Sequence, residues 1–342
     1  MGTTDDKSSH ASTRRRFLVD GSALAAASLL PLPGLAASEP PPEIKRIRLS
    51  HSPAICLAPQ YLVEDLLRLE GFSEIEYVKL PDLNGLDALA GDHFDFQMWD
   101  AYGALPHLDA GRPIVAIAGI HAGCYQLFAR GPIRGIRDLK GKTIAVYELG
   151  QGAHILVASM LAYVGMNPSR DVHWLAGERA EDALHAFEAG KADAFMGFPP
   201  HPQELLARKV GHVVLDTSRD RPWSQYFCCM LLANRRFTET YPVATKRVLR
   251  AFLKAADICA QEPDRAARLL VDKGFEPRYE IAHEVLKGVS YSRWREANPE
   301  DTLRFYGLRL YEVGMIKTNP NKLIARSTDW RFLNELKKEL RA

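Results

Sequence analysis

The chain has 342 residues, of which 46% are hydrophobic and 25% charged, so it has the composition of a globular protein and the length for two lobes with separate cores. Its formal net charge is +2, and its lysines and arginines are spread along the chain. Because no basic cluster stands out, the composition does not support nucleic-acid binding and favours a small-molecule partner.

The first forty residues differ from the rest of the chain. Residues 13–18 contain three consecutive arginines, and the small apolar run 21–30 follows them. This run is shorter than the roughly 20 residues that a membrane-spanning helix needs. We therefore expect a twin-arginine signal peptide at 1–37, cleaved near Ala37, which exports the protein to the periplasm. A proline-rich spacer is expected at 38–43. An uncleaved anchor or a disordered basic tail is the alternative.

The five cysteines show no metal-ligand spacing, and two of them are adjacent within an apolar run. We expect buried free thiols and no metal site, although an oxidising compartment would permit a disulfide whose pair the sequence does not identify. The cysteines are Cys56, Cys124, Cys228, Cys229 and Cys259.

Apolar periodicity predicts alternating strands and helices in the first part of the chain. The expected order is strand 44–50, a helix that ends before Gly71, strand 75–80, helix 83–90, strand 94–98, helix 102–108 and strand 114–120. This alternation predicts an α/β fold, with a mainly parallel sheet covered by helices on both faces.

A second series of the same kind begins at residue 138. It comprises strand 143–147, helix 151–164, strand 172–175, helix 181–189, strand 192–196, helix 203–209 and strand 213–215. Runs 125–129 and 226–233 are placed to cross between two lobes. Helical patterns then dominate, at 243–260, 265–271, 281–287, 301–313 and 330–340. We therefore expect a first lobe at 44–130, a second at 131–225, and at 226–342 a return with C-terminal helices packed on the first lobe.

Four segments carry a resemblance to a known family. Residues 136–146 and 150–154 resemble the second lobe of periplasmic binding proteins of the nitrate, sulfonate and taurine transport family, and 189–194 and 90–96 resemble its helix-to-strand steps in the two lobes. The resemblance covers roughly residues 44–260. This sequence departs from the family pattern at Gln97–Met98–Trp99–Asp100, where family members often carry smaller residues.

The resemblance implies a type II-like periplasmic binding protein fold with two crossing strands at a hinge. It further implies a monomeric, non-catalytic and cofactor-free component that binds a sulfonate, taurine or related acid and delivers it to an ABC-transporter permease in the inner membrane. Nitrate is an alternative ligand. The resemblance also extends to binders of thiamine-pyrimidine precursors and to the related pyrimidine-synthesising enzymes, whose cysteine-rich motif is missing here. A ligand-sensing role for a membrane receptor is a further alternative.

Candidate ligand-binding residues lie where each predicted strand gives way to its helix, because ligands of open α/β sheets bind beyond the carboxyl ends of the strands. Those of the first lobe are His51, Ser52, Trp99, Asp100, Tyr102 and His121. Those of the second lobe are Glu148, Gln151, Gly152, His154, Glu178 and His201.

The glycine-rich turn before residue 153 has two interpretations. Gly150 and Gly152 open a helix whose free N–H groups suit an anion, with His154 orienting toward it, or they only allow a tight turn. Trp99 and Tyr102 can stack on a ligand or serve in the core. The histidines lack a local ligand pair, so we expect them to act as hydrogen-bond partners.

Overall fold

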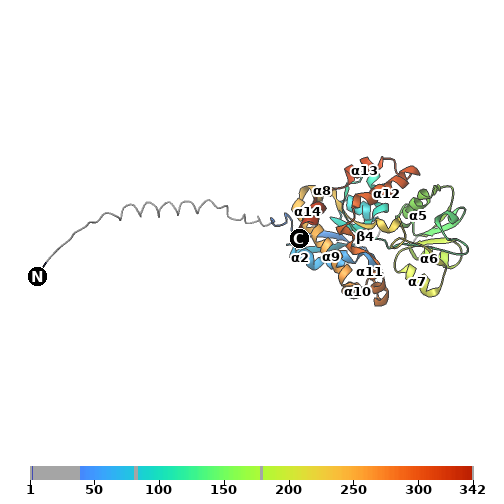
Figure 1. The fold of residues 1–342 in the computed structure, drawn as a ribbon, viewed down its shortest axis with the longest axis horizontal. Coiled ribbons are helices and arrows are strands. Elements are labelled where there is room, and N and C mark those ends of the chain that lie inside the picture. Colours follow the sequence, from blue (N-terminus) through green and yellow to red (C-terminus); the bar gives the residue numbers. More distant parts are fainter. Residues whose placement is uncertain (1, 3–38, 81–83, 178–179, 341–342) are drawn as a thin grey trace. The chain divides into compact units, whose positions relative to one another are not determined.

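The computed structural model describes Gly2 and residues 39–80, 84–177 and 180–340 (Figure 1). The expected signal peptide at 1–37 therefore lies outside the described residues, apart from Gly2. Residues Pro41–Ala342 form one compact unit. In the described part of the chain, no helix combines the length and the apolar composition needed to cross a membrane.

The first of two five-stranded sheets has the strand order β2–β1–β3–β10–β4. β1 is parallel to β2 and β3, whereas β10 runs antiparallel between β3 and β4. β4 and β10 are buried at every residue, which explains why they read as continuous apolar runs. The strands are β1 (Arg46–Ser50), β2 (Glu74–Val78), β3 (Phe96–Asp100), β4 (Ile114–Ala122) and β10 (Phe227–Asn234).

The second sheet has the order β7–β6–β8–β5–β9, with β6 parallel to β7 and β8, and β5 antiparallel to β8 and β9. Side chains alternate across it: Phe128 and Phe195 pack with α6 and α7, while Leu127 and Met196 belong to the main core. The strands are β5 (Gln126–Ala129), β6 (Thr143–Val146), β7 (His173–Ala176), β8 (Ala194–Gly197) and β9 (His212–Asp216).

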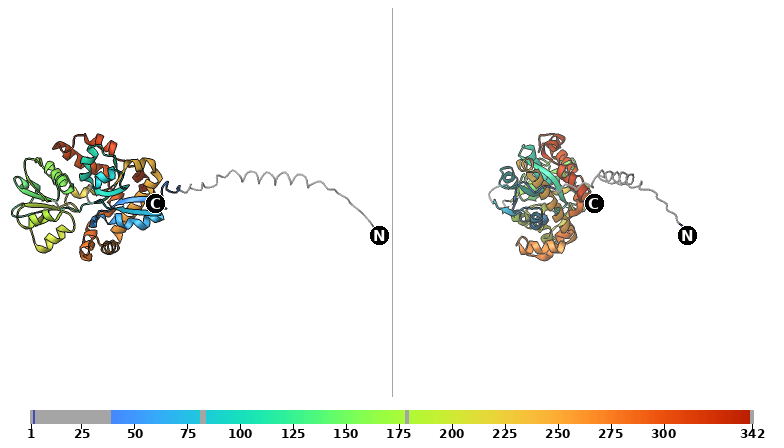
Figure 2. Two further views of the ribbon diagram at one scale, coloured as in Figure 1. Left: turned by 180° about the vertical axis from the view of Figure 1, so that it is seen from behind. Right: turned by 90° about the vertical axis from the view of Figure 1, so that its left-hand side faces the viewer.

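Helices cover both sheets, and the C-terminal ones pack on the first: α9 contacts α2 and β4, and α13 and α14 contact β4. Figure 1 shows α5, α6 and α7 around the second sheet and the other labelled helices around the first, and Figure 2 shows the same arrangement from two further sides. The helices of the first sheet's lobe are α2 (Ala58–Leu69), α3 (Gly85–Ala90), α4 (Ala101–Asp109), α8 (Arg235–Thr240), α9 (Pro242–Gln261), α10 (Pro263–Asp272), α11 (Tyr279–Gly288), α12 (Pro299–Glu312), α13 (Pro320–Ser327) and α14 (Arg331–Glu339). Those of the second are α5 (Gly152–Tyr163), α6 (Ala180–Glu188) and α7 (His201–Arg208). Short 3-10 turns are η2 (Ile55–Leu57), η3 (Ile136–Leu139), η4 (Trp223–Gln225) and η5 (Tyr291–Arg295).

The chain passes between the sheets earlier than expected. β5 pairs on both edges within the second sheet, so the run 125–129 does not cross between lobes, and the boundary moves from residue 130 to about Gly123. A Cβ on Gly123 would clash with the backbone of Ser218, so the outgoing and returning segments touch there. The Thr217 hydroxyl ties them further, since it accepts from the backbone N–H of Tyr125 at 3.0 Å and donates to its carbonyl at 2.8 Å.

Candidate functional site

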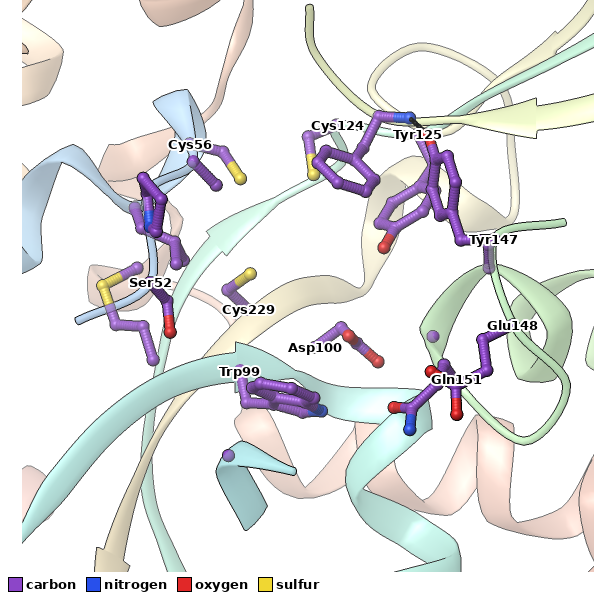
Figure 3. Close-up of a pocket in the computed structure, with 18 of the residues that line it drawn as sticks. Ser52, Cys56, Trp99, Asp100, Cys124, Tyr125, Tyr147, Glu148, Gln151 and Cys229 are labelled. Carbon is purple, nitrogen blue, oxygen red and sulfur yellow. Dashed lines mark hydrogen bonds between the residues drawn. The ribbon is translucent and has the colours of Figure 1, made fainter. Parts of the chain in front are cut away.

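A cavity of about 500 Å³ lies between the two sheets, and both lobes line it (Figure 3). Parallel strands of both sheets end at it, because their carboxyl ends and the helix starts that follow face one another. The first lobe contributes residues that follow β1, the end of β3 and the start of β10. The second contributes the start of α5 and the residues that follow β6 and β8. We call this cavity the cleft.

Trp99 and Asp100 are the last two residues of β3, which runs two residues beyond the strand expected at 94–98. Gln60 holds this strand in place: its side chain accepts from Met98 N at 2.8 Å and donates to the Ser50 carbonyl at 2.8 Å, which links β3 to β1. Trp99 is partly exposed, and its indole N–H has no partner among the described residues. The indole nitrogen itself is buried, so what Trp99 presents to the cleft is part of its aromatic ring.

The Asp100 carboxylate sits between two helix N-termini. Its Oδ1 accepts from Gly103 N at 2.7 Å and so caps α4. Across the cleft, a Cβ placed on Gly152 would lie 2.5 Å from Asp100 Oδ2, so only the bare backbone of α5 fits against the carboxylate. Burial, followed by the charge of Cys228, raises the pKa of Asp100 to about 7. Asp100 therefore changes its charge near neutral pH.

The turn between β6 and α5 has no side-chain cap of its own. Gln151 stands at the N-cap without a side-chain hydrogen bond, and Gly150 adopts a left-handed conformation with φ +83°. Gly150 N donates to His154 Nδ1 at 3.0 Å, so His154 binds its own turn. Its ring meets Trp174 edge-on at 4.5 Å, and burial lowers the pKa of His154 to about 4. The neutral ring thus supports the turn and is not among the cleft-lining residues.

Aromatic side chains form the second lobe's wall of the cleft. Tyr125, at the crossing, lies 5.7 Å from the Phe198 ring, which meets Tyr147 edge-on at 4.8 Å. The Tyr147 hydroxyl accepts from Phe198 N at 2.9 Å and lies 3.2 Å from His201 Nδ1, so His201 acts behind this wall. With Trp99 on the opposite side, the cleft presents flat apolar faces that suit a planar ligand.

The structure brings together most, but not all, of the residues expected from the sequence. The cleft is lined by His51, Ser52, Trp99, Asp100, Glu148, Gln151 and Gly152. Four expected residues lie outside its lining: Tyr102, His121, His154 and His201. Glu178 lies outside the described residues.

The secondary structure explains why two of these four residues, His121 and Tyr102, lie outside the lining. β4 extends to Ala122, so His121 is a buried strand residue and not part of a loop as expected. Tyr102 lies in the first turn of α4, where its hydroxyl contacts Cys228 Sγ at 3.4 Å beneath the cleft. Both therefore belong to the layer behind the lining.

Sequence reasoning missed the thiols and the second-lobe aromatics. Cys56, Cys124 and Cys229 line the cleft, as do Tyr125 and Phe198. Phe198 follows β8 directly, at a strand end from which the sequence reasoning chose His201 instead, and Tyr125 stands three residues after β4, at the start of the run expected to cross between lobes. The thiols come from a 3-10 turn, a crossing segment and a strand, and they share no local spacing.

The charge of the cleft is one-sided. Among the described residues that line it, Asp100 and Glu148 are acidic, and none is an arginine or a lysine. A bare anion would therefore meet carboxylates without a cationic side chain to balance them.

Two α/β lobes, two connecting segments and a cleft at the strand ends define a periplasmic binding protein fold, and solved structures share it. The alkanesulfonate-binding protein SsuA from Xanthomonas axonopodis pv. citri, bound to MOPS, matches with a TM-score of 0.67 and 18% identity, covering 84% of this chain and 99% of that one. SsuA from Escherichia coli, a periplasmic aliphatic sulphonate binding protein, matches with a TM-score of 0.65 and 20% identity, covering 83% and 92%. The periplasmic nitrate-binding protein NrtA from Synechocystis PCC 6803 matches with a TM-score of 0.72 and 15% identity, covering 88% and 90%.

In sequence, residues 129–271 match the model of the NMT1-like family. A comparison with curated proteins finds no match. The resemblance to sulfonate- and nitrate-binding proteins that the sequence predicted is thus confirmed, and so is the fold class. At these identities, the likeness to solved structures concerns the fold.

Proposed function

We propose that this protein is the periplasmic solute-binding component of an ABC-type importer, exported by its N-terminal signal and acting without catalysis. A cleft shared by two lobes supports this function, because each lobe carries only part of the lining. Closure about the segments at Gly123 and Thr217 would bury a ligand and create a surface for the permease.

One observation guides the choice of ligand: the described cleft lining has two carboxylates, aromatic faces and one histidine, but no arginine or lysine. Of the ligands considered from the sequence, a planar molecule with amino or ring N–H donors, such as a thiamine-pyrimidine precursor, satisfies this lining best. Its donors would meet Asp100, and its ring would pack against Trp99 and Phe198. Nitrate fits worst, because it offers neither a donor nor apolar area.

A zwitterionic sulfonate such as taurine is the second candidate, and one observation favours it. The N-terminus of α5 opens into the cleft without a side-chain cap, which leaves backbone N–H groups and a positive dipole end for a sulfonate. The ammonium group of the same molecule would be left for Asp100 or Glu148. A sulfonate without a cationic end lacks this second contact.

Thermal shift against 4-aminopyrimidines, taurine, simple alkanesulfonates and nitrate tests the proposal, since a ligand of the native state raises the apparent stability. The pH then separates ligands that donate to ionised Asp100, by an amino or an ammonium group, from sulfonates without such a group, and the thermal shifts separate aminopyrimidines from taurine. If a ligand donates to ionised Asp100, its affinity should rise by up to about tenfold from pH 6 to pH 8, and Asp100→Asn should remove the rise. A sulfonate that needs protonated Asp100 should show the opposite trend.

Calorimetry on the same panel measures the affinities. Binding of nitrate or simple alkanesulfonates in preference to aminopyrimidines and taurine would contradict the proposed ligand class. Conversion of any bound ligand, detected by mass spectrometry, would contradict the non-catalytic role.

A further inference from the structure

Four of the five cysteines converge behind and along one wall of the cleft. They come from η2, the first crossing segment and β10, and a histidine from β4 joins them. We call these five residues the thiol–imidazole cluster: Cys56, His121, Cys124, Cys228 and Cys229. All five are at most 8% exposed. The fifth cysteine, Cys259, is buried elsewhere in α9.

The cluster has the dimensions of a metal site. The ligand atoms of Cys56, His121 and Cys124 all lie within 4.8 Å of one another, and so do those of His121, Cys228 and Cys229. The Sγ atoms of Cys124 and Cys228 are 3.1 Å apart. Zinc binds sulfur at about 2.3 Å and imidazole nitrogen at about 2.0–2.1 Å in tetrahedral geometry, so two ligand atoms on one ion are about 3.5–3.8 Å apart, up to about 1 Å closer than the limit within which these atoms lie. Small side-chain adjustments are therefore enough for either triad to hold an ion.

The imidazole of His121 lacks the partners that a buried histidine normally has. Its side chain is 0% exposed, neither ring nitrogen makes a hydrogen bond of good geometry within the described residues, and the polar group that interacts with it most strongly is the Cys56 thiol. Its ring packs edge-on against the ring of Tyr291, with 5.4 Å between the centroids, and the Tyr291 hydroxyl donates to the Cys56 carbonyl. Buried polar atoms are nearly always paired, so an imidazole without a well-formed hydrogen bond among thiols calls for an explanation, and a bound ion supplies one.

We propose that the thiol–imidazole cluster binds one thiophilic d¹⁰ metal ion, Zn²⁺ or Cu⁺, in the wall of the cleft. Soft thiolate ligands with imidazole select these ions among the biological metals. On binding Zn²⁺, two thiols release their protons to solvent, and two thiolates with a neutral imidazole cancel the charge of the ion. A neutral centre is the arrangement that burial tolerates best.

The ion would be reachable from the cleft. Cys56, Cys124 and Cys229 line it, and Figure 3 shows their sulfur atoms on one side of the open space, opposite Glu148 and Gln151. Such an ion would add a Lewis-acidic centre to a lining that has no arginine or lysine among its described residues. The inference goes beyond solute binding and does not depend on which solute is taken.

The test is a titration of the purified, fully reduced protein with Zn²⁺ alone in the absence of oxygen, against a chromophoric chelator. We expect one equivalent per chain, and Co²⁺ in its place should give sulfur-to-metal charge-transfer absorption. A parallel titration with Cu⁺ identifies the preferred ion. Cys56→Ser and Cys124→Ser should each weaken binding by about 100-fold or more, because losing a ligand costs at least as much as losing a group that only supports one.

Cys259→Ser is the matched control, because it removes a buried thiol outside the cluster, and it should bind as the unchanged protein does. Circular dichroism verifies the fold of each variant. The cobalt spectrum of the unchanged protein gives an answer even if a variant does not fold. Absence of stoichiometric Zn²⁺ and Cu⁺ binding would overturn the proposal. So would a Cys124–Cys228 disulfide that persists in the native protein under reducing conditions, or serine variants that bind metal as the unchanged protein does.

Discussion

Two strand-to-helix turns face each other across the cleft, and they are built differently. In the first lobe, β3 passes into α4 through Asp100, whose carboxylate caps the helix through Gly103 N. In the second, β6 passes into α5 through a turn without a side-chain cap, and bare Gly152 lies against that same carboxylate. One acidic side chain thus caps α4 and lies against the first residue of α5, so the charge of Asp100 acts where the two lobes approach one another.

The difference teaches where the sensitivity of the cleft lies. Asp100 is held by its own lobe, while the second lobe supplies space and free N–H groups. The contact of α5 with α4 brings the two together. Substitutions of Asp100 should therefore alter stability mainly by changing the charge of the cleft, and substitutions of Gly152 mainly by steric clash with Asp100.

The largest effect is expected from Asp100→Asn on the pH dependence of stability. Asp100 has a pKa of about 7 in the folded state, against about 3.9 for an unfolded aspartate. Between these values, the folded protein keeps a proton that the unfolded chain has released, so the free energy of unfolding falls as the pH rises. Between pH 5 and pH 8, the free energy of unfolding should therefore fall by up to about 3 kcal/mol less in Asp100→Asn than in the unchanged protein.

Urea unfolding at the two pH values measures this difference. Glu239→Gln, which removes an exposed carboxylate in α8, is the control and should leave the pH dependence unchanged. If Asp100→Asn and the unchanged protein lose the same stability from pH 5 to pH 8, the carboxylate is not perturbed by the cleft.

The next largest effect is expected from Gly152→Ala. The new Cβ would lie 2.5 Å from Asp100 Oδ2, so the carboxylate or the helix must move, at a cost of about 1–3 kcal/mol. In an Asp100→Ala background the same change should be neutral or stabilising, because alanine is a better helix former than glycine. A double-mutant cycle by urea unfolding measures this coupling.

Gly150→Ala separates backbone strain from contact. Gly150 has φ +83° and nothing within 4 Å of its added Cβ, so the change should cost about 1–2 kcal/mol from conformation alone. That cost should be the same with and without Asp100. Equal coupling of both glycines to Asp100 would mean that the carboxylate does not lie against α5 in solution.

The sequence allowed the fold and part of the cleft to be predicted, because both follow from local patterns. Strands and helices alternate, and the ends of parallel strands meet, so Ser52, Trp99 and Gln151 could be placed in advance. The ends of strands were less predictable, because an apolar run does not show where hydrogen bonding to the neighbouring strand stops. The strand expected to end at residue 98, for example, continues to Asp100.

What depends on distant segments could not be predicted. The approach of Asp100 to Gly152 joins residues of different lobes, and the thiol–imidazole cluster joins four segments without a motif. His154 misled for a related reason. Its position one turn into α5 suggested a ligand donor, whereas Gly150 N and Trp174 already engage the ring.

The smallest effect is expected from His154→Ala, which removes the acceptor for Gly150 N and should cost about 1 kcal/mol of stability at pH 7. Because the ring is not part of the cleft lining, the ligand affinity measured by calorimetry should change less than about twofold. A twofold change corresponds to much less free energy than one hydrogen bond contributes.

The same variant should alter the pH dependence of stability. Burial lowers the pKa of His154 to about 4, whereas an unfolded histidine takes up its proton near 6.5. The unfolded chain therefore gains protons first as the pH falls through this window, and stability is lost there. His154→Ala should reduce that loss between pH 7 and pH 5, and His173→Ala, an exposed histidine of β7, should not. An affinity loss of tenfold or more, with an unchanged pH dependence of stability, would mean that the imidazole contacts the ligand. The turn between β6 and α5 would then bind the ligand through a side chain, as the turn between β3 and α4 is expected to do through Asp100.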